Sequence, residues 1–377
     1  EIINGMPEIK LNNFQDYKAK EWKDIQEKQY KADIDSLKVN QVQSAGYSLI
    51  NQVRNITVTF LVAVSVVQGH ITLGMMMSIT YIIGQMNSPL EQLIGFVRNF
   101  QDSKISLERA GEIHILENED NKVEYQKIPD SVSNIKLEDV YFRYGPFSDK
   151  MVLNNINLLI PKGKVTAIVG ESGSGKTTLL KLLLKYYQQT DGEILIDNYD
   201  INNFSSDEWR KRCGIVMQES YIFSETILRN IVLGADPIDE NRLKEAIKIS
   251  NLQEFIENKP LKLHTKIGKS GLGISGGEKQ RIMIARAVYK KPQYLFLDEA
   301  TSSLDADNES IIVQNLEHFF KGRTVVIIAH RLSTVKNADQ IVVLKNGIIT
   351  EVGNHEQLIR KKEVYYKLVF NQLELAK

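Results

Sequence analysis

The stretch KVTAIVGESGSGKTTLLKLLLKYY, residues 164–187, decides which kind of fold this sequence can adopt. It begins with a short apolar run, continues with GESGSGKT at residues 170–177, and ends in a run with the composition of a helix. Two glycines separated by four residues and followed by Lys and Thr form the phosphate-loop pattern, which is meaningful where a strand precedes it and a helix follows. Both conditions hold here, so the sequence predicts a strand, a phosphate-binding loop and a helix in this order.

The chemistry of this loop suggests a role for each member. Glycine permits the backbone conformations in which successive N–H groups curl around phosphate oxygens. We expect Lys176 to reach the β- and γ-phosphates as a point charge and the Thr177 hydroxyl to be a ligand of Mg²⁺. The predicted nucleotide-binding residues of the loop are Gly170, Glu171, Ser172, Gly173, Ser174, Gly175, Lys176, Thr177 and Thr178.

A second apolar run, QYLFLDEA at residues 293–300, ends in two adjacent carboxylates. We expect Asp298 to hold Mg²⁺, directly or through water. Glu299 lies one residue further along, where its side chain could orient the attacking water or accept its proton. A pair of helix-capping acids is the alternative interpretation, but the phosphate loop in the same chain favours the catalytic one.

Two more predicted strands end in residues that could complete such a site. Gln218 follows the apolar run in CGIVMQES, and His330 follows the run in RTVVIIAHR. Ligands of open α/β sheets bind outside the carboxyl ends of the strands. We therefore expect Gln218 to contact Mg²⁺ or water and His330 to contact the γ-phosphate, although a lone histidine can also be a simple packing residue.

The stretch GLGISGGEKQRIMIARA, residues 271–287, predicts a second anion-binding segment. Ser275, Gly276 and Gly277 run directly into a helix-like segment, which would expose backbone N–H groups and the positive end of the helix dipole. The chain thus contains two separate phosphate-binding segments, and this duplication requires an explanation.

The order of the apolar runs predicts an α/β domain with a mostly parallel sheet, because strand-like and helix-like stretches alternate from Ile135 onward. Residues 118–133 are charged and lack an apolar pattern, so they are predicted to be a linker. The formal net charge of zero and pI near 7.2 do not favour nucleic acid as a partner. The single cysteine, Cys213, excludes an intrachain disulfide. The strand-like runs are IKLEDVYF, KVTAIVG, GEILID, RCGIVMQ, QYLFLDEA, RTVVIIAH and QIVVLKNG.

Residues 55–90 contain no Asp, Glu, Lys or Arg. A membrane span takes roughly 20 apolar residues, so we predict two spans at about residues 44–67 and 71–94, joined by a short turn. Lysines and arginines flank both outer ends and none lies in the turn, which places both ends on the cytoplasmic side. A buried helical hairpin of a soluble protein is the alternative. Polar residues in the first span suggest that further spans lie upstream and that the chain is a fragment.

With these motifs in order, residues 134–377 resemble the nucleotide-binding domain of an ABC transporter. The motifs are YGPFSDKMVLNNINLLIPKGK, GESGSGKTT, Gln218, ISGGEKQ, LFLDEATSSLD and His330. The resemblance implies an α/β P-loop NTPase domain with a helical subdomain, ATP and Mg²⁺ as cofactors, and the Mg²⁺-binding residues Thr177, Gln218 and Asp298. It further implies that Tyr144 stacks on adenine, Glu299 is the catalytic base, His330 completes the site, and Ser302–Asp305 form a loop that communicates across a dimer.

The resemblance also offers an explanation of the second phosphate-binding segment. In this family Ser275, Gly276 and Gly277 would cap the γ-phosphate of ATP bound to the partner chain's loop. A head-to-tail homodimer with two ATP molecules is the simplest arrangement, because one chain carries both halves of a site.

An apolar hairpin ahead of the ATPase domain resembles the end of an ABC exporter's transmembrane domain. By this resemblance residues 1–117 contain a coupling helix at about 13–22 and the last two spans, in the bacterial inner (plasma) membrane with the ATPase domain in the cytoplasm. A narrower similarity to peptidase-containing exporters suggests peptides or bacteriocins with a double-glycine leader as cargo. Lipid or drug export is the alternative, followed by a soluble ABC ATPase and a regulatory subunit without turnover.

Two features depart from the family pattern. Glu278 replaces the usual glutamine after the two glycines and would add a negative charge near the partner's nucleotide. Lys266 and Lys269 lie in the segment before Ser275, where exporters usually have glutamates. The second difference concerns coupling to the membrane part and leaves ATP binding unaffected.

Overall fold

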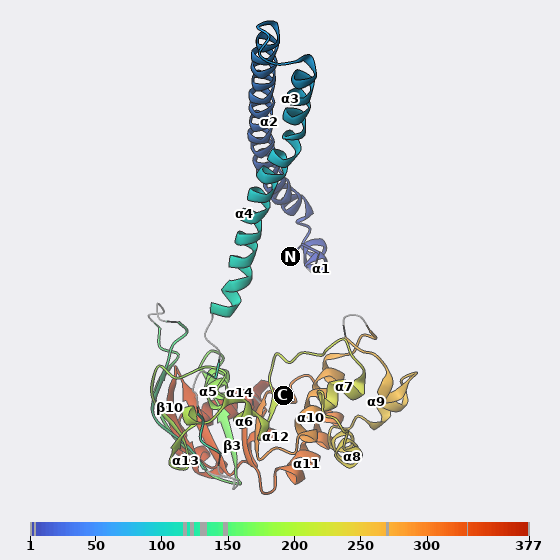
Figure 1. Cartoon of the computed structure of the whole chain (residues 1–377). Helices are drawn as coiled ribbons and strands as arrows, with labels where there is room; N and C mark the ends of the chain where they lie inside the picture. The colour runs from blue at the N-terminus through green and yellow to red at the C-terminus, as the bar shows by residue number, and fades with distance from the viewer. Residues whose placement is uncertain are drawn as a thin grey trace. The chain divides into compact units, whose positions relative to one another are not determined.

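The computed structural model describes residues 2–3, 5–115, 119–120, 124–128, 134–145, 150–268, 271–329 and 331–375. The chain divides into two compact units, Glu1–Glu117 and Asn118–Lys377. The first consists of helices and the second contains all the strands, as Figure 1 shows.

The first unit is a helical hairpin with extensions. The long helix α2 runs next to α3, and the Thr72 hydroxyl caps α3 by accepting the N–H of Met75. No residue of α2 is buried, and apolar side chains such as Ile56 and Phe60 are 70% and 66% exposed. Such a large exposed apolar surface fits lipid or further helices better than water. The helices are α1 (Met6–Leu11), α2 (Gln15–Val67), α3 (Leu73–Gln85) and α4 (Asn87–Ile115).

The structure differs from the predicted spans in one respect. Among the described residues, α2 alone is long and apolar enough to cross a membrane. The predicted second span at 71–94 is interrupted at Met86, so that it comprises α3 and the start of α4. Pro89 explains the break, because it has no N–H to donate to the carbonyl of Gln85 and its ring would clash with that carbonyl in a continuous helix.

The segment predicted to be a coupling helix, about residues 13–22, is continuous with a longer helix in the structure. Residues 15–22 form the first turns of α2, and the short independent helix is α1, further upstream. Asn13 has a φ of 54°, in the left-handed region, and this conformation separates α1 from α2.

The second unit has two sheets. A four-stranded antiparallel sheet has the order β2-β1-β4-β5, and a six-stranded sheet has the order β10-β9-β3-β8-β7-β6. All pairs of the larger sheet are parallel except β10 with β9, which confirms the predicted mostly parallel sheet. The strands are β1 (Ile135–Phe142), β2 (Leu153–Ile160), β3 (Val165–Val169), β4 (Asp191–Ile196), β5 (Tyr199–Asp200), β6 (Cys213–Val216), β7 (Tyr294–Asp298), β8 (Thr324–Ile328), β9 (Gln340–Lys345) and β10 (Ile348–Gly353).

The central strands are buried on both faces. All five residues of β7 are buried, and they alternate between two hydrophobic clusters: Tyr294 and Phe296 belong to one, Leu295 and Leu297 to the other. This period of two is expected of a strand covered on both sides. By the same alternation, Asp298 faces the side on which the phosphate-loop helix packs.

Helices cover the larger sheet and form a helical part of their own. The long helix α10 packs against α7 and α8 (Figure 1) and also contacts the edge strand β6. The helices are α5 (Lys176–Leu183), α6 (Ser206–Lys211), α7 (Ile227–Val232), α8 (Glu240–Ile249), α9 (Gln253–Glu257), α10 (Gly276–Tyr289), α11 (Ala306–Phe320), α12 (Leu332–Val335), α13 (His355–Lys361) and α14 (Val364–Leu375).

The described part of the predicted linker packs against the second unit. Ile128 is 5% exposed within the hydrophobic cluster between the two sheets. Asp120 accepts the backbone N–H of Ser206 and the hydroxyl of Ser205 at the start of α6. One of the acidic residues that favoured a linker, Asp120, therefore caps the start of α6.

Candidate nucleotide-binding site

The phosphate loop lies between β3 and α5, where the sequence predicts it. Gly170 has a φ of 157°, and a Cβ added there would lie 2.0 Å from the carbonyl oxygen of Leu344. Gly175 has a φ of 102°, and its Cβ would lie 2.7 Å from Leu153 Cδ2. The loop is therefore too tightly surrounded for side chains at these two positions, and its backbone is what a ligand would meet.

Lys176 is buried at the start of α5, and its ammonium group lies under the loop. Its Nζ donates to the carbonyl oxygens of Gly170 at 2.9 Å and Glu171 at 2.8 Å. Burial lowers the pKa of Lys176, while the nearby carboxylates of Glu299 and Asp298 act in the opposite direction. A positive charge thus lies where the γ-phosphate of a nucleotide would approach the loop.

Asp298 and Thr177 meet at the end of β7. The Thr177 hydroxyl donates to Asp298 Oδ2 at 2.8 Å, whereas Asp298 Oδ1 is buried and has no hydrogen-bond partner among the described residues. Burial raises the pKa of Asp298, and the charge of Glu299 adds to this, while the Thr177 hydrogen bond and Lys176 lower it. A buried carboxylate oxygen without a partner, beside a hydroxyl, is a suitable pair of oxygen ligands for Mg²⁺.

Glu299 has an unusual backbone conformation. Its φ is 50°, in the left-handed region that residues other than glycine rarely adopt. Its N–H donates to Ile328 O at 3.0 Å and its carbonyl accepts the N–H of Ser302 at 3.1 Å. Its carboxylate accepts Gln218 Nε2 at 3.2 Å. The structure thus brings Gln218, Glu299, Asp298 and Thr177 together, as the sequence predicts.

Tyr144 lies close to the phosphate-loop helix. Its hydroxyl shares a hydrogen bond of 2.8 Å with Thr178 Oγ1, and its ring packs edge-on against Phe142 and Tyr187. Tyr144 is 47% exposed, so part of its surface is accessible to a flat ligand such as adenine.

The segment before α10 has the geometry of a helix cap. Ser275 Oγ accepts the N–H of Glu278 at 3.2 Å, and the Glu278 carboxylate accepts the N–H of Ser275 at 2.6 Å, which together make a capping box. Lys259 Nζ lies 3.7 Å from the same carboxylate. The Glu278 carboxylate is thus bound to the N-terminus of its own helix, and Lys259 partly balances its negative charge.

The two segments predicted to bind phosphate lie apart in the described structure. Within the described ranges no hydrogen bond joins Ser275, Gly276 or Gly277 to the loop at 170–178, and the two segments lie on different parts of the domain, before α10 and before α5 (Figure 1).

Two other predicted residues have different outcomes. Asp305 caps α11 by accepting the N–H and Nδ2 of Asn308, and these hydrogen bonds lower the pKa of Asp305. His330 lies outside the described residues.

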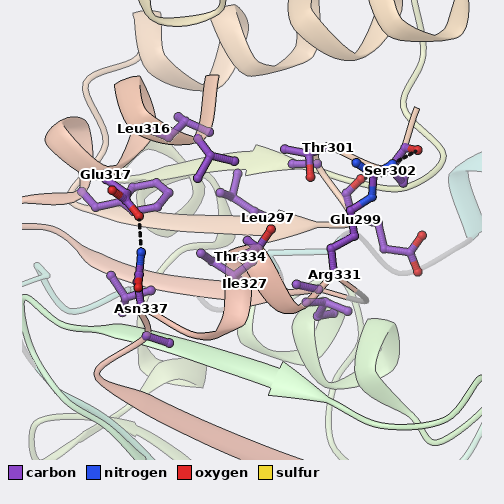
Figure 2. A pocket seen from close by; sticks show the side chains of 17 residues that line it. Leu297, Glu299, Thr301, Ser302, Leu316, Glu317, Ile327, Arg331, Thr334 and Asn337 are labelled. Carbon is purple, nitrogen blue, oxygen red and sulfur yellow. Dashed lines mark hydrogen bonds between the residues drawn. The ribbon is translucent and has the colours of Figure 1, made fainter. Parts of the chain in front are cut away.

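Two cavities flank the Asp298–Glu299 pair. One of about 740 Å³ is lined by Thr177, Gln218 and Asp298. The other, of about 450 Å³, lies between β7, β8, α11 and α12, with Glu299 and Ser302 at one end and the hydrogen-bonded pair Glu317–Asn337 at the other (Figure 2). The first cavity has the charged and polar lining that a nucleotide phosphate and Mg²⁺ require, so we place the reaction there.

Sequence reasoning missed one residue near the site. Gln280 on α10 donates from Nε2 to Glu299 O at 2.7 Å and accepts the N–H of Ser303 at Oε1 at 2.8 Å. Its position one turn beyond Gly276 on a predicted helix places it on the same face as that residue, which was the available signal.

The family model described as ABC transporter matches residues 153–302. The chain is 40% identical over 306 residues to the alpha-hemolysin translocation ATP-binding protein of Escherichia coli O157:H7, covering 81% of this chain and 43% of that protein. It is 37% identical over 333 residues to the leukotoxin translocation ATP-binding protein of Mannheimia glucosida, covering 88% and 46%. It is also similar to the structure of a bacterial Atm1-family ABC exporter with ATP bound, with a TM-score of 0.89 and 28% identity over 98% of this chain and 65% of that chain.

The fold is therefore that of an ABC exporter, with a helical transmembrane part followed by an ABC ATPase domain, and the predicted fold class is confirmed. The chain spans less than half the length of the two toxin-translocation proteins, so their activities as whole proteins are proposals for this chain. The narrower resemblance to peptidase-containing bacteriocin exporters stays a prediction.

Proposed function

We propose that this chain is the ATP-hydrolysing part of an ABC exporter and that it works as a head-to-tail dimer with two Mg·ATP molecules. One observation carries this proposal: the two segments predicted to bind phosphate, 170–178 and 275–277, begin different helices and share no hydrogen bond among the described residues. Each segment then serves a different nucleotide. A symmetric pair of chains uses both, because the loop of one chain faces Ser275–Gly277 of the other.

The loop and Lys176 would hold the phosphates. Thr177, Gln218 and Asp298 would serve Mg²⁺, which supplies charge stabilisation to the phosphoryl group when bound. Asp298 supports this role through its buried oxygen without a partner and its hydrogen bond from Thr177. The exposed ring of Tyr144 would stack on adenine.

Glu299 would accept the proton of the attacking water. Its carboxylate is held by Gln218, and its backbone is held by hydrogen bonds to its N–H and carbonyl groups, so the carboxylate has a defined position. His330 would complete the site at the γ-phosphate, and Asp305 would lie in the loop that faces the partner.

ATP binding would close the dimer, and hydrolysis would reopen it and reset the membrane part. We place the first unit in the bacterial inner membrane and the ATPase domain in the cytoplasm. A polypeptide is the favoured cargo, since the two relatives are named for translocation of alpha-hemolysin and leukotoxin. A peptide or bacteriocin with a double-glycine leader is our more specific proposal within that class.

Substitution of Glu299 tests the proposal. In Glu299→Gln the side chain keeps its size but cannot accept a proton, so ATP hydrolysis should fall by about 10²-fold or more while binding persists. Incubation with Mg·ATP followed by mass measurement in detergent should show a dimer that holds two nucleotides. Glu317→Gln, which alters a carboxylate at the opposite end of the cavity that Glu299 lines, is the matched control and should behave as wild type. Hydrolysis at the wild-type rate in Glu299→Gln would disprove the base assignment, and a monomer that holds ATP would disprove the dimeric site.

A further inference from the structure

Gln280 joins α10 to the loop that follows β7. From one side chain, Nε2 donates to the carbonyl of Glu299 at 2.7 Å and to Ser302 Oγ at 3.4 Å, and Oε1 accepts the N–H of Ser303 at 2.8 Å. The Gln280 amide group therefore donates to and accepts from one loop, at Glu299, Ser302 and Ser303. Figure 2 shows Glu299 and Ser302 next to each other in that loop.

The first turn of α10 packs directly on the same loop. A Cβ added to Gly277 would lie 3.1 Å from Ser303 O, and a Cβ added to Gly276 would lie 3.6 Å from Ser303 Cβ. The start of α10 thus contacts the loop that begins at Glu299 in two ways. Gly276 and Gly277 pack on this loop, and Gln280 forms hydrogen bonds with it.

The Glu299 backbone needs such support. A left-handed conformation is strained for a residue with a side chain, and it persists only where neighbouring groups enforce it. Here the N–H is held by Ile328 O, and the carbonyl is held by Gln280 Nε2 and by the N–H of Ser302. Gln280 is the member of this set that comes from α10.

We propose that Gln280 is a positioning residue that links the nucleotide bound by the partner chain to the catalytic Glu299 of its own chain. This inference rests on the proposed function, in which the partner's ATP docks on Ser275–Gly277. Docking fixes the start of α10, α10 carries Gln280, and Gln280 fixes the carbonyl and thereby the carboxylate direction of Glu299. Each chain then hydrolyses its own ATP efficiently only when the other site is filled, which makes the two sites cooperative.

Gln280→Ala removes the donor and the acceptor of this link. Gln280→Glu keeps the acceptor for Ser303, removes the donor and places a carboxylate against the Glu299 carbonyl. Lys279→Ala changes the adjacent residue, whose side chain has no hydrogen bond or ion pair in the described structure, and is the matched control. The full chain in detergent is used, and ATP hydrolysis is measured against ATP concentration with saturating Mg²⁺.

Wild type and Lys279→Ala should show a Hill coefficient clearly above 1 and at most about 2, the limit set by two sites. Both Gln280 variants should show a coefficient near 1 and a kcat lowered by roughly 10-fold, with half-saturation for binding of a fluorescent ATP analogue within about 2-fold of wild type. The thermal unfolding midpoint of both Gln280 variants should stay within a few degrees of that of wild type. A merely structural role would instead lower this midpoint when cooperativity is lost.

Unchanged cooperativity and kcat in Gln280→Ala would overturn the link, as would a wild-type chain that dimerises on ATP but hydrolyses it without cooperativity. A wild-type chain that binds ATP without dimerising would instead refute the proposed function, so the two failures are distinguishable.

Discussion

Substitution of Thr177 by valine should weaken Mg²⁺ binding without changing the shape of the site. Valine has nearly the same size as threonine but lacks the hydroxyl that donates to Asp298 Oδ2 at 2.8 Å. Because Asp298 Oδ1 already has no partner in the described structure, the substitution leaves a buried carboxylate with neither oxygen hydrogen-bonded. A hydrogen bond to a charged group contributes about 1.5–3 kcal/mol, which corresponds to roughly 10- to 150-fold in an equilibrium constant.

The pH dependence should move in a definite direction. The pKa of Asp298 is raised by burial, and the Thr177 hydrogen bond is the largest influence that lowers it. Mg²⁺ binds the ionised carboxylate, so the loss of this hydrogen bond favours the protonated form and competes with the metal. In Thr177→Val the acidic limb of Mg²⁺ binding should therefore lie at higher pH than in wild type.

Binding of a fluorescent ATP analogue at increasing Mg²⁺ measures this effect without requiring turnover. Thr177→Val should need about 10-fold more Mg²⁺ or greater for half-saturation, whereas Thr177→Ser keeps the hydroxyl and should stay within roughly 3-fold of wild type. A valine variant with the Mg²⁺ requirement and acidic limb of wild type would refute the assignment of Thr177 and Asp298.

Three further outcomes follow from the geometry. Gly170→Ala should lower the free energy of unfolding by about 3 kcal/mol or more and abolish ATP binding, because its Cβ would lie 2.0 Å from Leu344 O. Gly173→Ala has open space around its Cβ and should lower the free energy of unfolding, measured by urea titration, by only about 1–2 kcal/mol. Equal losses in the two variants would contradict the described loop. Glu278→Ala should lower the free energy of unfolding by about 0.5–2 kcal/mol through loss of the capping box. Because hydrogen bonds from Ser275 lower the pKa of Glu278 in the folded chain, this difference from wild type should be present at pH above the usual glutamate pKa and vanish as pH falls through the lowered pKa. A stability difference that grows on acidification would contradict this assignment. Pro89→Ala should join α3 to α4, seen as slower hydrogen exchange at Asn87 and Ser88, and unchanged exchange would show that another feature breaks the helix at Met86.

Local motifs predicted the ATPase domain well because its chemistry depends on short stretches. The strand, loop and helix at 164–187 follow from glycine spacing and apolar patterning, and Asp298, Glu299 and Gln218 come together because parallel strands end at one edge of the sheet.

Features that depend on tertiary context were harder to predict. The antiparallel sheet of β1, β2, β4 and β5 contains apolar runs that look like those of the parallel sheet, and pairing direction is not written in a single run. The absence of charged residues predicts one continuous span at 71–94, but it carries no information about helix breaks; Pro89 is the residue that predicts the break at Met86. The packing of Ile128 and the bridge made by Gln280 depend on residues far away in the sequence.

The most direct measurement mixes two inactive chains. Lys176→Ala removes the charge of the phosphate loop. Gly276→Asp places a carboxylate at the start of α10, where an added Cβ makes only an ordinary contact with Ser303. Each variant alone should hydrolyse almost no ATP. An equal mixture, exchanged to equilibrium, should recover activity up to a ceiling of about a quarter of wild type, because half of the dimers have one intact site out of two. The Gln280 link lowers the recovered share below this ceiling, because the Glu299 of the intact site belongs to the Gly276→Asp chain, whose own α10 start docks no nucleotide. A mixture no more active than its components, with mixed dimers present, would contradict the claim that each ATP is bound by two chains.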